Sequence, residues 1–307
     1  MRQFLAASAV VAALLAAPSQ AQQVTQPASN VDILDVDRDR YGRMTVPVWI
    51  GEHGPFDFLI DTGSERTVLA RGLATRLGLV PSGSAVLVGM AGTLLAQLVD
   101  VAELRLGRRS FYSLSAPLLE GQHIGADGII GLDGLRNQRV LIDFKRNLIA
   151  VDDAKVLGGN RGFEVIVRAR PRSEQLVITN GLVDGVKTIV VLDTGANNSV
   201  GNRALQRQLI TRRKGVPIVL SSATGQQVSA DVLYVRRVRI GALDLLDLPL
   251  AIVDAPAFER LGLADKPTLM IGMDQLRAFN RVAIDFSTRR VLFDLPPEAV
   301  SGSPRAD

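Results

Sequence analysis

Cysteine is absent from the 307 residues of this chain, and histidine occurs only twice. The absence of cysteine excludes disulfides, a thiol nucleophile, cysteine-ligated metals and the acylated N-terminal cysteine of bacterial lipoproteins. The two histidines, His53 and His123, lie in separate Gly-containing segments, too far apart for metal-ligand spacing. We therefore expect no metal and no cofactor, and we expect both histidines to be exposed.

Aromatic residues are also scarce, at 5% of the chain, although the formal net charge is +4. The basic clusters at 212–214 and 236–239 contain no interleaved aromatic side chains that could stack on bases. We expect no nucleic-acid partner. These clusters are typical of a solvated surface, and attraction to an acidic partner is the alternative.

Three further functional motifs are missing or incomplete. The chain has no Gly-x-Ser-x-Gly sequence and no glycine-rich phosphate loop, which argues against serine hydrolases and nucleotide-dependent enzymes. The acidic stretch 35–39 resembles the start of a calcium loop. However, Arg40 stands where that loop needs glycine and Val46 where it needs glutamate, so we do not expect a calcium site.

Long apolar runs are absent after the N-terminus. Arg2, the apolar stretch 4–17 and the small-residue end Ser19-Gln20-Ala21 predict a signal peptide over residues 1–21, with a retained anchoring helix as the alternative. We expect a flexible arm over 22–30 and no transmembrane segment once the leader is removed. The expected location is the periplasm, with secretion as the alternative.

The tripeptide Asp-Thr-Gly occurs twice, at 61–63 and 193–195, and each copy ends an apolar run. Each copy is followed by an apolar-apolar-Gly element, at 129–131 and 270–272. These matching contexts indicate a duplicated unit rather than two ordinary strand-ending turns. We predict β-rich halves at 31–155 and 163–297, a linker at 156–162 and a disordered tail at 298–307.

Each half also contains a predicted hairpin between these motifs, at about 85–98 and 217–232. The matching positions suggest a mobile cover over a site, and an ordinary surface hairpin is the alternative. Helices are predicted only at 69–77 and 203–209 and as turns near Asp133 and Asp274, which we interpret as helix N-caps.

Two carboxylates held about 3 Å apart cannot both ionise easily, so one remains protonated while the other can accept a proton from water. Asp61 and Asp193, one from each half, are the candidate pair. Glycines after each aspartate permit tight loops, and the threonines can connect the loops through hydroxyl hydrogen bonds. The titration belongs to the pair, so neither residue is assigned as acid or base at this point.

The segments LIDTGSERTVLA and VLDTGANNSVGN resemble the two halves of retropepsin-like or pepsin-like aspartic proteases. The similarity spans about residues 40–295. It implies an all-β, bilobal pepsin-like acid protease fold, with two homologous β-barrel lobes and the active-site cleft between them. Because one chain carries both halves, we expect a monomer.

The resemblance implies that Asp61 and Asp193 are catalytic. It also implies supporting loop residues and candidates for the flap and for substrate contact. The supporting residues are Thr62, Gly63, Ser64, Thr194, Gly195 and Ala196. The flap and substrate candidates are Glu65, Gly89, Met90, Ala91, Gly92, Asn197, Ala223, Thr224 and Gly225.

The two copies differ after the glycine. Ser64 can donate a hydrogen bond to its aspartate, as in pepsins, whereas Ala196 cannot. We expect this difference to make the two carboxyls unequal and to place activity at mildly acidic pH. The implied function is an aspartic endopeptidase that acts on peptides or proteins. A silent peptide-binding module that retains the cleft is the alternative.

Overall fold

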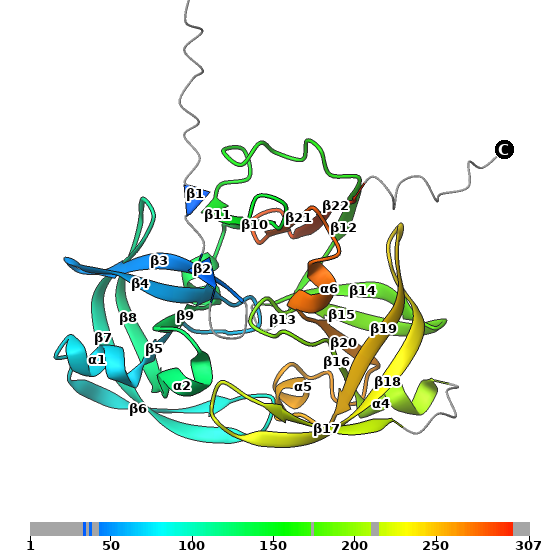
Figure 1. The fold of residues 1–307 in the computed structure, drawn as a ribbon, viewed down its shortest axis with the longest axis horizontal. Coiled ribbons are helices and arrows are strands. Elements are labelled where there is room, and N and C mark those ends of the chain that lie inside the picture. Colours follow the sequence, from blue (N-terminus) through cyan, green and yellow to red (C-terminus); the bar gives the residue numbers. More distant parts are fainter. Residues whose placement is uncertain (1–32, 35–36, 39–42, 173–174, 210–214, 297–307) are drawn as a thin grey trace, which may run out of the picture. The chain divides into compact units, whose positions relative to one another are not determined.

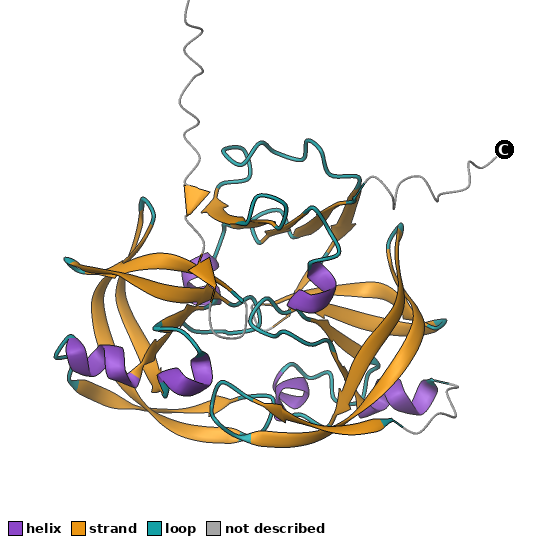
Figure 2. Ribbon diagram, viewed as in Figure 1, coloured by secondary structure: helices purple, strands orange, loops and turns teal. Residues whose placement is uncertain are grey.

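The structure is a computed structural model that describes residues 33–34, 37–38, 43–172, 175–209 and 215–296. Strands dominate these residues and the helices are short (Figure 2). The expected leader, arm and tail lie outside the described residues, as do the basic cluster at 212–214 and most of the acidic stretch 35–39. No helix in the described ranges is both long and apolar enough to cross a membrane.

The first half forms an eight-stranded sheet in the order β2-β3-β4-β9-β5-β8-β7-β6 (Figure 1). An additional pairing of β3 with β7 curls this sheet back on itself around a buried core. The strands are β2 (Asp37–Arg38), β3 (Met44–Ile50), β4 (His53–Ile60), β5 (Val68–Ala70), β6 (Pro81–Val88), β7 (Thr93–Leu106), β8 (Arg109–Leu119) and β9 (Gly128–Ile130).

The second half repeats this topology in the order β13-β14-β15-β20-β16-β19-β18-β17, with β14 also paired to β18. The strands are β13 (Arg170–Arg172), β14 (Gln175–Val183), β15 (Val186–Leu192), β16 (Val200–Asn202), β17 (Val216–Ser221), β18 (Gln227–Ile240), β19 (Leu243–Val253) and β20 (Thr268–Ile271). The duplicated, all-β, bilobal fold is therefore confirmed. The two predicted hairpins are β6–β7 and β17–β18.

A third sheet takes strands from both halves in the order β1-β11-β10-β21-β22-β12. Its strands are β1 (Ile33–Leu34), β10 (Arg139–Asp143), β11 (Leu148–Asp152), β12 (Val165–Arg168), β21 (Arg281–Asp285) and β22 (Arg290–Asp294). The repeat-related strands β10 and β21 pair antiparallel at the centre, with Leu141 opposite Ala283. The register is symmetric about that pair, so the sheet joins the two halves about a local twofold axis.

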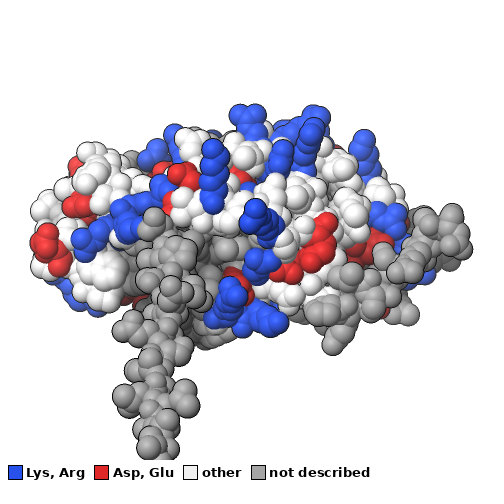
Figure 3. Space-filling view, turned by 90° about the horizontal axis from the view of Figure 1, so that it is seen from above, with Lys and Arg blue, Asp and Glu red and all other residues white. Residues whose placement is uncertain are grey.

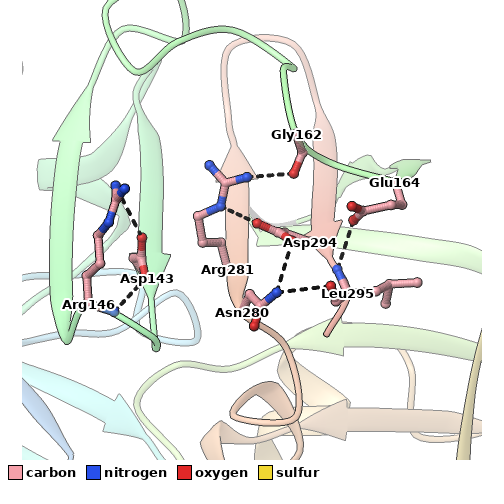
Figure 4. Close-up of polar contacts among 8 residues, drawn as sticks. All are labelled: Asp143, Arg146, Gly162, Glu164, Asn280, Arg281, Asp294 and Leu295. Carbon is pink, nitrogen blue, oxygen red and sulfur yellow. Dashed lines mark hydrogen bonds and ion pairs between the residues drawn. The ribbon is translucent and has the colours of Figure 1, made fainter. Parts of the chain in front are cut away.

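Two arginines occupy equivalent places in this central pairing. Arg139 donates to Asp285 at 2.7 Å, and both side chains are buried. At the other end of the register, Arg281 pairs with Asp294 and donates to the Gly162 carbonyl at 2.6 Å (Figure 4). The opposing Asp143 accepts instead from the backbone N–H of Arg146, so the sheet contains one fully buried cross-half ion pair rather than two.

Figure 3 looks down on the molecule from above the view of Figure 1. It shows Lys and Arg side chains over this face with Asp and Glu among them.

The described helices are short. They are α1 (Arg71–Arg76), α2 (Gly121–Ile124), α3 (Leu132–Leu135), α4 (Arg203–Gln208), α5 (Pro256–Arg260) and α6 (Met273–Leu276). The predicted helix at 203–209 is confirmed, with Asn202 as its N-cap. The helix predicted from residue 69 begins two residues later, because Leu69 and Ala70 pair with β8 as part of β5. Helices α2 and α5 were not predicted.

The prediction that Asp133 and Asp274 cap helices is wrong. Gly131 and Gly272 are the N-cap residues of α3 and α6, and the aspartates lie in the first turn. Asp133 accepts hydrogen bonds from the backbone N–H and hydroxyl of Thr67 instead. Asp274 accepts at 3.3 Å from the Asn198 side chain. Each aspartate therefore connects a short helix to the loop that follows Asp-Thr-Gly.

Candidate active site

Asp61 and Asp193 each follow the last residue of a strand, β4 and β15, whose final three residues are buried. The backbone N–H of Asp61 donates to the carbonyl of Ile130 at 3.0 Å, and that of Asp193 donates to Ile271 at 2.9 Å. These acceptors end β9 and β20, which pair in parallel with the aspartate-bearing strands. The apolar-apolar-Gly elements therefore fix the backbone position at which each aspartate leaves its sheet.

The two threonines join the loops of the opposite halves. The N–H of Thr62 donates to the Thr194 hydroxyl at 3.0 Å, and the N–H of Thr194 donates to the Thr62 hydroxyl at 3.2 Å. Each hydroxyl in turn donates to a carbonyl of the opposite half: Thr62 to Leu192 at 2.9 Å, and Thr194 to Ile60 at 2.7 Å. Both side chains are buried, so this reciprocal network fixes the distance between the loops.

The glycines of the two tripeptides lie against the opposite aspartates. A Cβ at Gly63 would stand 2.7 Å from Cγ of Asp193, and a Cβ at Gly195 would stand 2.2 Å from Cγ of Asp61. No side chain fits at either position. Each carboxyl therefore lies directly against the loop of the opposite half, and the two carboxyls are close enough for each to affect the pKa of the other.

Two backbone N–H groups support each carboxyl. Gly63 and Ser64 donate to Oδ1 of Asp61 at 2.7 and 3.0 Å. Gly195 and Ala196 donate to Oδ1 of Asp193 at 3.1 and 3.2 Å. Such donors stabilise a negative charge on the oxygen that accepts them, and both repeats supply the same number.

Burial raises the pKa of both carboxyls above the ordinary value for aspartate, because it disfavours the charged form. For Asp193, burial and then the charge of Asp61 raise the pKa to about 8. For Asp61, the N–H of Gly63 and the charge of Arg43 oppose the effect of burial on the pKa. Burial and the mutual charge therefore favour a pair that retains a proton, and the singly protonated pair is the state that can act on water and a carbonyl together.

The sequence difference between Ser64 and Ala196 does not change the hydrogen bonds that the two carboxyls receive. The Ser64 hydroxyl donates to the Arg66 carbonyl at 2.8 Å, and only its backbone N–H serves Asp61. The expected hydroxyl bond to Asp61 is therefore a wrong prediction. The hydroxyl finds a backbone acceptor two residues along its own loop, and Ser64 and Ala196 support their aspartates in the same way.

Two residues that sequence reasoning missed also support the loops. Arg43 Nη1 donates to the carbonyl of Gly195 at 2.9 Å, and Gln175 Nε2 donates to the carbonyl of Gly63 at 2.6 Å. Each precedes the aspartate of its own repeat by 18 residues, yet each bonds to the opposite loop. This equal spacing is the signal in the sequence that could have identified the pair.

Glu65 and Asn197 occupy equivalent positions but make different contacts. Glu65 forms a bidentate ion pair with Arg260 of α5, at 2.9 and 3.2 Å, which connects the two halves. The backbone carbonyl of Asn197 accepts from Asp274 at 3.0 Å, and its buried side-chain oxygen has no hydrogen-bond partner among the described residues. The structure therefore gives the two substrate-contact candidates unlike surroundings.

The tips of the two hairpins contact each other. The side chain of Gln226 donates to the carbonyl of Thr93 at 3.0 Å, and a Cβ at Gly89 would lie 3.1 Å from the hydroxyl of Ser222. Met90, at the tip of the first hairpin, packs against the apolar core of the second half. The candidate residues 89–92 and 223–225 thus lie together in one cross-half contact (Figure 1).

His123 is only partly exposed, contrary to the expectation for both histidines, whereas His53 is exposed as predicted. The imidazole of His123 lies against Gly225, where a Cβ would stand 2.6 Å from Nε2. A cavity of about 190 Å³ opens beside it, between the first hairpin and α2. Its lining is Arg71, Leu94, Leu95, Ala96, Leu118, Leu119, Glu120, His123 and Thr224.

The comparisons agree with this geometry. A family model described as aspartyl protease matches residues 46–133 and 179–275. The two matched regions contain both Asp-Thr-Gly tripeptides and both apolar-apolar-Gly elements. The chain belongs to the aspartyl protease family, which supports peptidase activity in general. No significant match was found among curated proteins.

Proposed function

We propose that this protein is an aspartic endopeptidase that hydrolyses peptide bonds in peptides or proteins with water activated between Asp61 and Asp193. The observation that carries the proposal is the facing arrangement of these two carboxyls, each presented by the same loop from a separate repeat and each lying against the glycine of the opposite loop. A binding module has no need for two adjoining carboxyls that share a proton.

The chemistry follows from the one proton that the pair retains. The ionised carboxyl accepts a proton from water as the water oxygen attacks the peptide carbonyl, while the protonated carboxyl donates to the carbonyl oxygen. The tetrahedral diol then collapses: one hydroxyl returns its proton to a carboxylate, and the departing nitrogen takes the proton that came from water. The products are a carboxylic acid and an amine, and the pair again holds one proton.

The paired hairpins support a polypeptide as the substrate. Their tips contact each other through Gln226 and Thr93, and a chain bound in an extended form would meet hairpin strands from both repeats. Edge strands β6 and β17 offer unpaired backbone groups suited to such a chain. Because both halves come from one chain, we propose that the monomer is the active unit.

The test is cleavage of an unstructured protein by the purified wild type and by Asp61→Asn and Asp193→Asn variants. Asp247→Asn is a matched control, because Asp247 is exposed and its φ of 53° suits asparagine equally well. The proposal predicts cleavage by the wild type and the control only. Absence of cleavage by the wild type across a broad pH range, together with retained binding of peptide, would assign the cleft to the silent binding module instead.

The proposed location is the periplasm, and it rests on the leader-like residues 1–21 and the absence of cysteine. Expression with a C-terminal tag, followed by fractionation and N-terminal sequencing, tests it. A periplasmic protein that begins at Gln22 supports the proposal. Recovery only in the growth medium favours secretion, and a product in the membrane fraction that still begins at Met1 favours a retained anchor.

A further inference from the structure

Arg43 and Gln175 are equivalent by position but differ in charge. Both bond the glycine carbonyl of the opposite loop; Gln175 is buried, at 4% exposed, and Arg43 is half-buried. Arg43 makes a second hydrogen bond, from Nη2 to the carbonyl of Ile124. Arginine remains charged at every accessible pH, whereas glutamine offers only a dipole. The two residues thus make equivalent hydrogen bonds to the glycine carbonyls, but only Arg43 brings a positive charge to the carboxyl pair.

This charge makes the surroundings of the two carboxyls unequal. The backbone donors are matched, two N–H groups on each side. Arg43 bonds the carbonyl of Gly195, and a Cβ on Gly195 would stand 2.2 Å from Cγ of Asp61, so the guanidinium lies on the Asp61 side of the pair. In keeping with this placement, the charge of Arg43 lowers the pKa of Asp61, and the charge of Asp61 in turn raises the pKa of Asp193. Glu65, an acidic residue in the loop after Asp61, is balanced by Arg260 at 2.9 Å.

We propose that Arg43 is a positioning residue that keeps the negative charge of the pair on Asp61 and the shared proton on Asp193. In the reaction, Asp61 then accepts the proton from water and Asp193 donates to the peptide carbonyl. The assignment of these roles rests on the proposed function. The placement of the charge is a property of the folded protein alone.

A purely structural role for Arg43 is the competing explanation, and Gln175 shows how to separate the two. A glutamine at position 175 already makes the equivalent bond to a glycine carbonyl at 2.6 Å. Arg43→Gln should therefore retain the contact to Gly195 and remove the charge, together with the hydrogen bond to the Ile124 carbonyl. Arg43→Lys retains the charge. The double variant Arg43→Gln/Gln175→Arg moves the charge to the other side of the pair.

The first readout is the pH dependence of kcat. Arg43 stabilises the singly and the doubly ionised pair, so its replacement by glutamine should move both limbs of the profile to higher pH, by about one unit. Arg43→Lys should move them much less. Arg236→Gln, which removes an exposed arginine of β18, is the control for loss of one positive charge and should leave the profile in place. A uniform fall in kcat with unmoved limbs would overturn the proposal in favour of a structural role.

The second readout needs no catalysis. Carbon-13 NMR of the Asp carboxyl carbons, assigned through their Cβ atoms, reports which carboxyl holds the proton. We expect Asp193 to be protonated and Asp61 ionised in the wild type at pH 6, and the reverse in Arg43→Gln/Gln175→Arg. A proton that stays on Asp193 in the folded double variant overturns the proposal. If that variant does not fold, the same NMR measurement on Arg43→Gln tests the proposal. Carboxyl chemical shifts equal to those of the wild type overturn it, and a proton shared more evenly between the two carboxyls supports it.

The two readouts keep the two proposals distinguishable. If the wild type cleaves nothing but the NMR signals reverse as expected, the endopeptidase function fails and the charge placement stands. If the wild type cleaves protein and neither the signals nor the limbs move, the charge placement fails and the endopeptidase function stands.

Discussion

Thr62 and Thr194 join the two halves through four hydrogen bonds. Each hydroxyl accepts from the N–H of the other threonine and donates to a carbonyl of the opposite half. The bonds lie at the point where the two loops meet and are shielded from solvent. Unlike the central sheet, which joins the halves at a distance from the carboxyls, this network sets the separation of the loops themselves.

The first prediction concerns Thr62→Val, which keeps the shape of the side chain and removes its hydroxyl. The N–H of Thr194 and the carbonyl of Leu192 lose their partner, so we expect the free energy of unfolding to fall by about 2 to 4 kcal/mol. Activity should fall in the folded variant as well. Urea denaturation and a cleavage assay measure both effects. Thr62→Ser retains the hydroxyl, and a loss of stability as large as that of the valine variant would contradict this account.

The second prediction is that the carboxyl pair destabilises the protein near neutral pH. The raised pKa of Asp193 means that the folded state binds a proton more tightly than the unfolded state does. Protonated Asp193 therefore does not destabilise the folded state at low pH. This favourable condition is fully present below the unfolded pKa of about 3.8, and it is lost as pH rises towards the folded pKa of about 8, where Asp193 must ionise in a buried place. Asp193→Asn does not titrate, so it should be more stable than the wild type at pH 7, on the order of 3 kcal/mol, and the advantage should shrink towards pH 4. Denaturation at both pH values tests this, and an equal difference at the two would contradict it.

The third prediction concerns the buried ion pair of Arg139 and Asp285. Burial alone would raise the pKa of Asp285, but the N–H of Thr288 and the Arg139 guanidinium hold that pKa below its ordinary value. Arg139→Met leaves a buried carboxylate without its cation and should cost about 3 to 5 kcal/mol. In Arg139→Met/Asp285→Leu the uncompensated charge is gone, so the double variant should be more stable than the single one. The opposite order in thermal unfolding would show that other contacts of Arg139, such as that to Asn160, dominate.

The fourth prediction concerns the contact between the hairpins. Gln226→Ala removes the hydrogen bond to the Thr93 carbonyl. A bond of this kind contributes about 1 kcal/mol, so we expect KM for an unstructured protein to rise about fivefold with little change in kcat. Gln227→Ala, which affects only a long 3.4 Å contact to Ser221 within its own hairpin, is the matched control. Equal effects of the two substitutions would contradict a role for the contact in substrate binding.

The duplicated fold could be predicted because its signals are local. The apolar runs, the Asp-Thr-Gly tripeptides and the alternating hairpin strands each lie within a short stretch of sequence. The two unpredicted helices, α2 and α5, contain four and five residues, which is too few to show a helical period. Their existence depends on packing against strands rather than on an amphipathic pattern.

The supports of the site were harder to predict because they connect distant residues through backbone atoms. The carbonyl of Gly195 accepts from Arg43, 152 residues away, and because every residue has a backbone carbonyl, residue type does not reveal this acceptor. Only the equal spacing of Arg43 and Gln175 before their aspartates points to the two supports. The ion pair of Glu65 with Arg260 spans 195 residues. Ser64, by contrast, was a reasonable candidate for asymmetry. Its rotamer directs the hydroxyl to Arg66, so the asymmetry arises from Arg43 and Gln175 instead.

The most direct measurement of the central claim is kcat/KM of the wild type, Asp61→Asn, Asp193→Asn and the double variant on one unstructured protein. Two carboxyls that share one proton act as a unit, so each single substitution should lower kcat/KM by more than about 10³-fold and the double substitution should lower it no further. Asp247→Asn should match the wild type. Either single variant retaining a tenth of the activity, or single losses that multiply in the double variant, would contradict the claim that Asp61 and Asp193 form one catalytic pair.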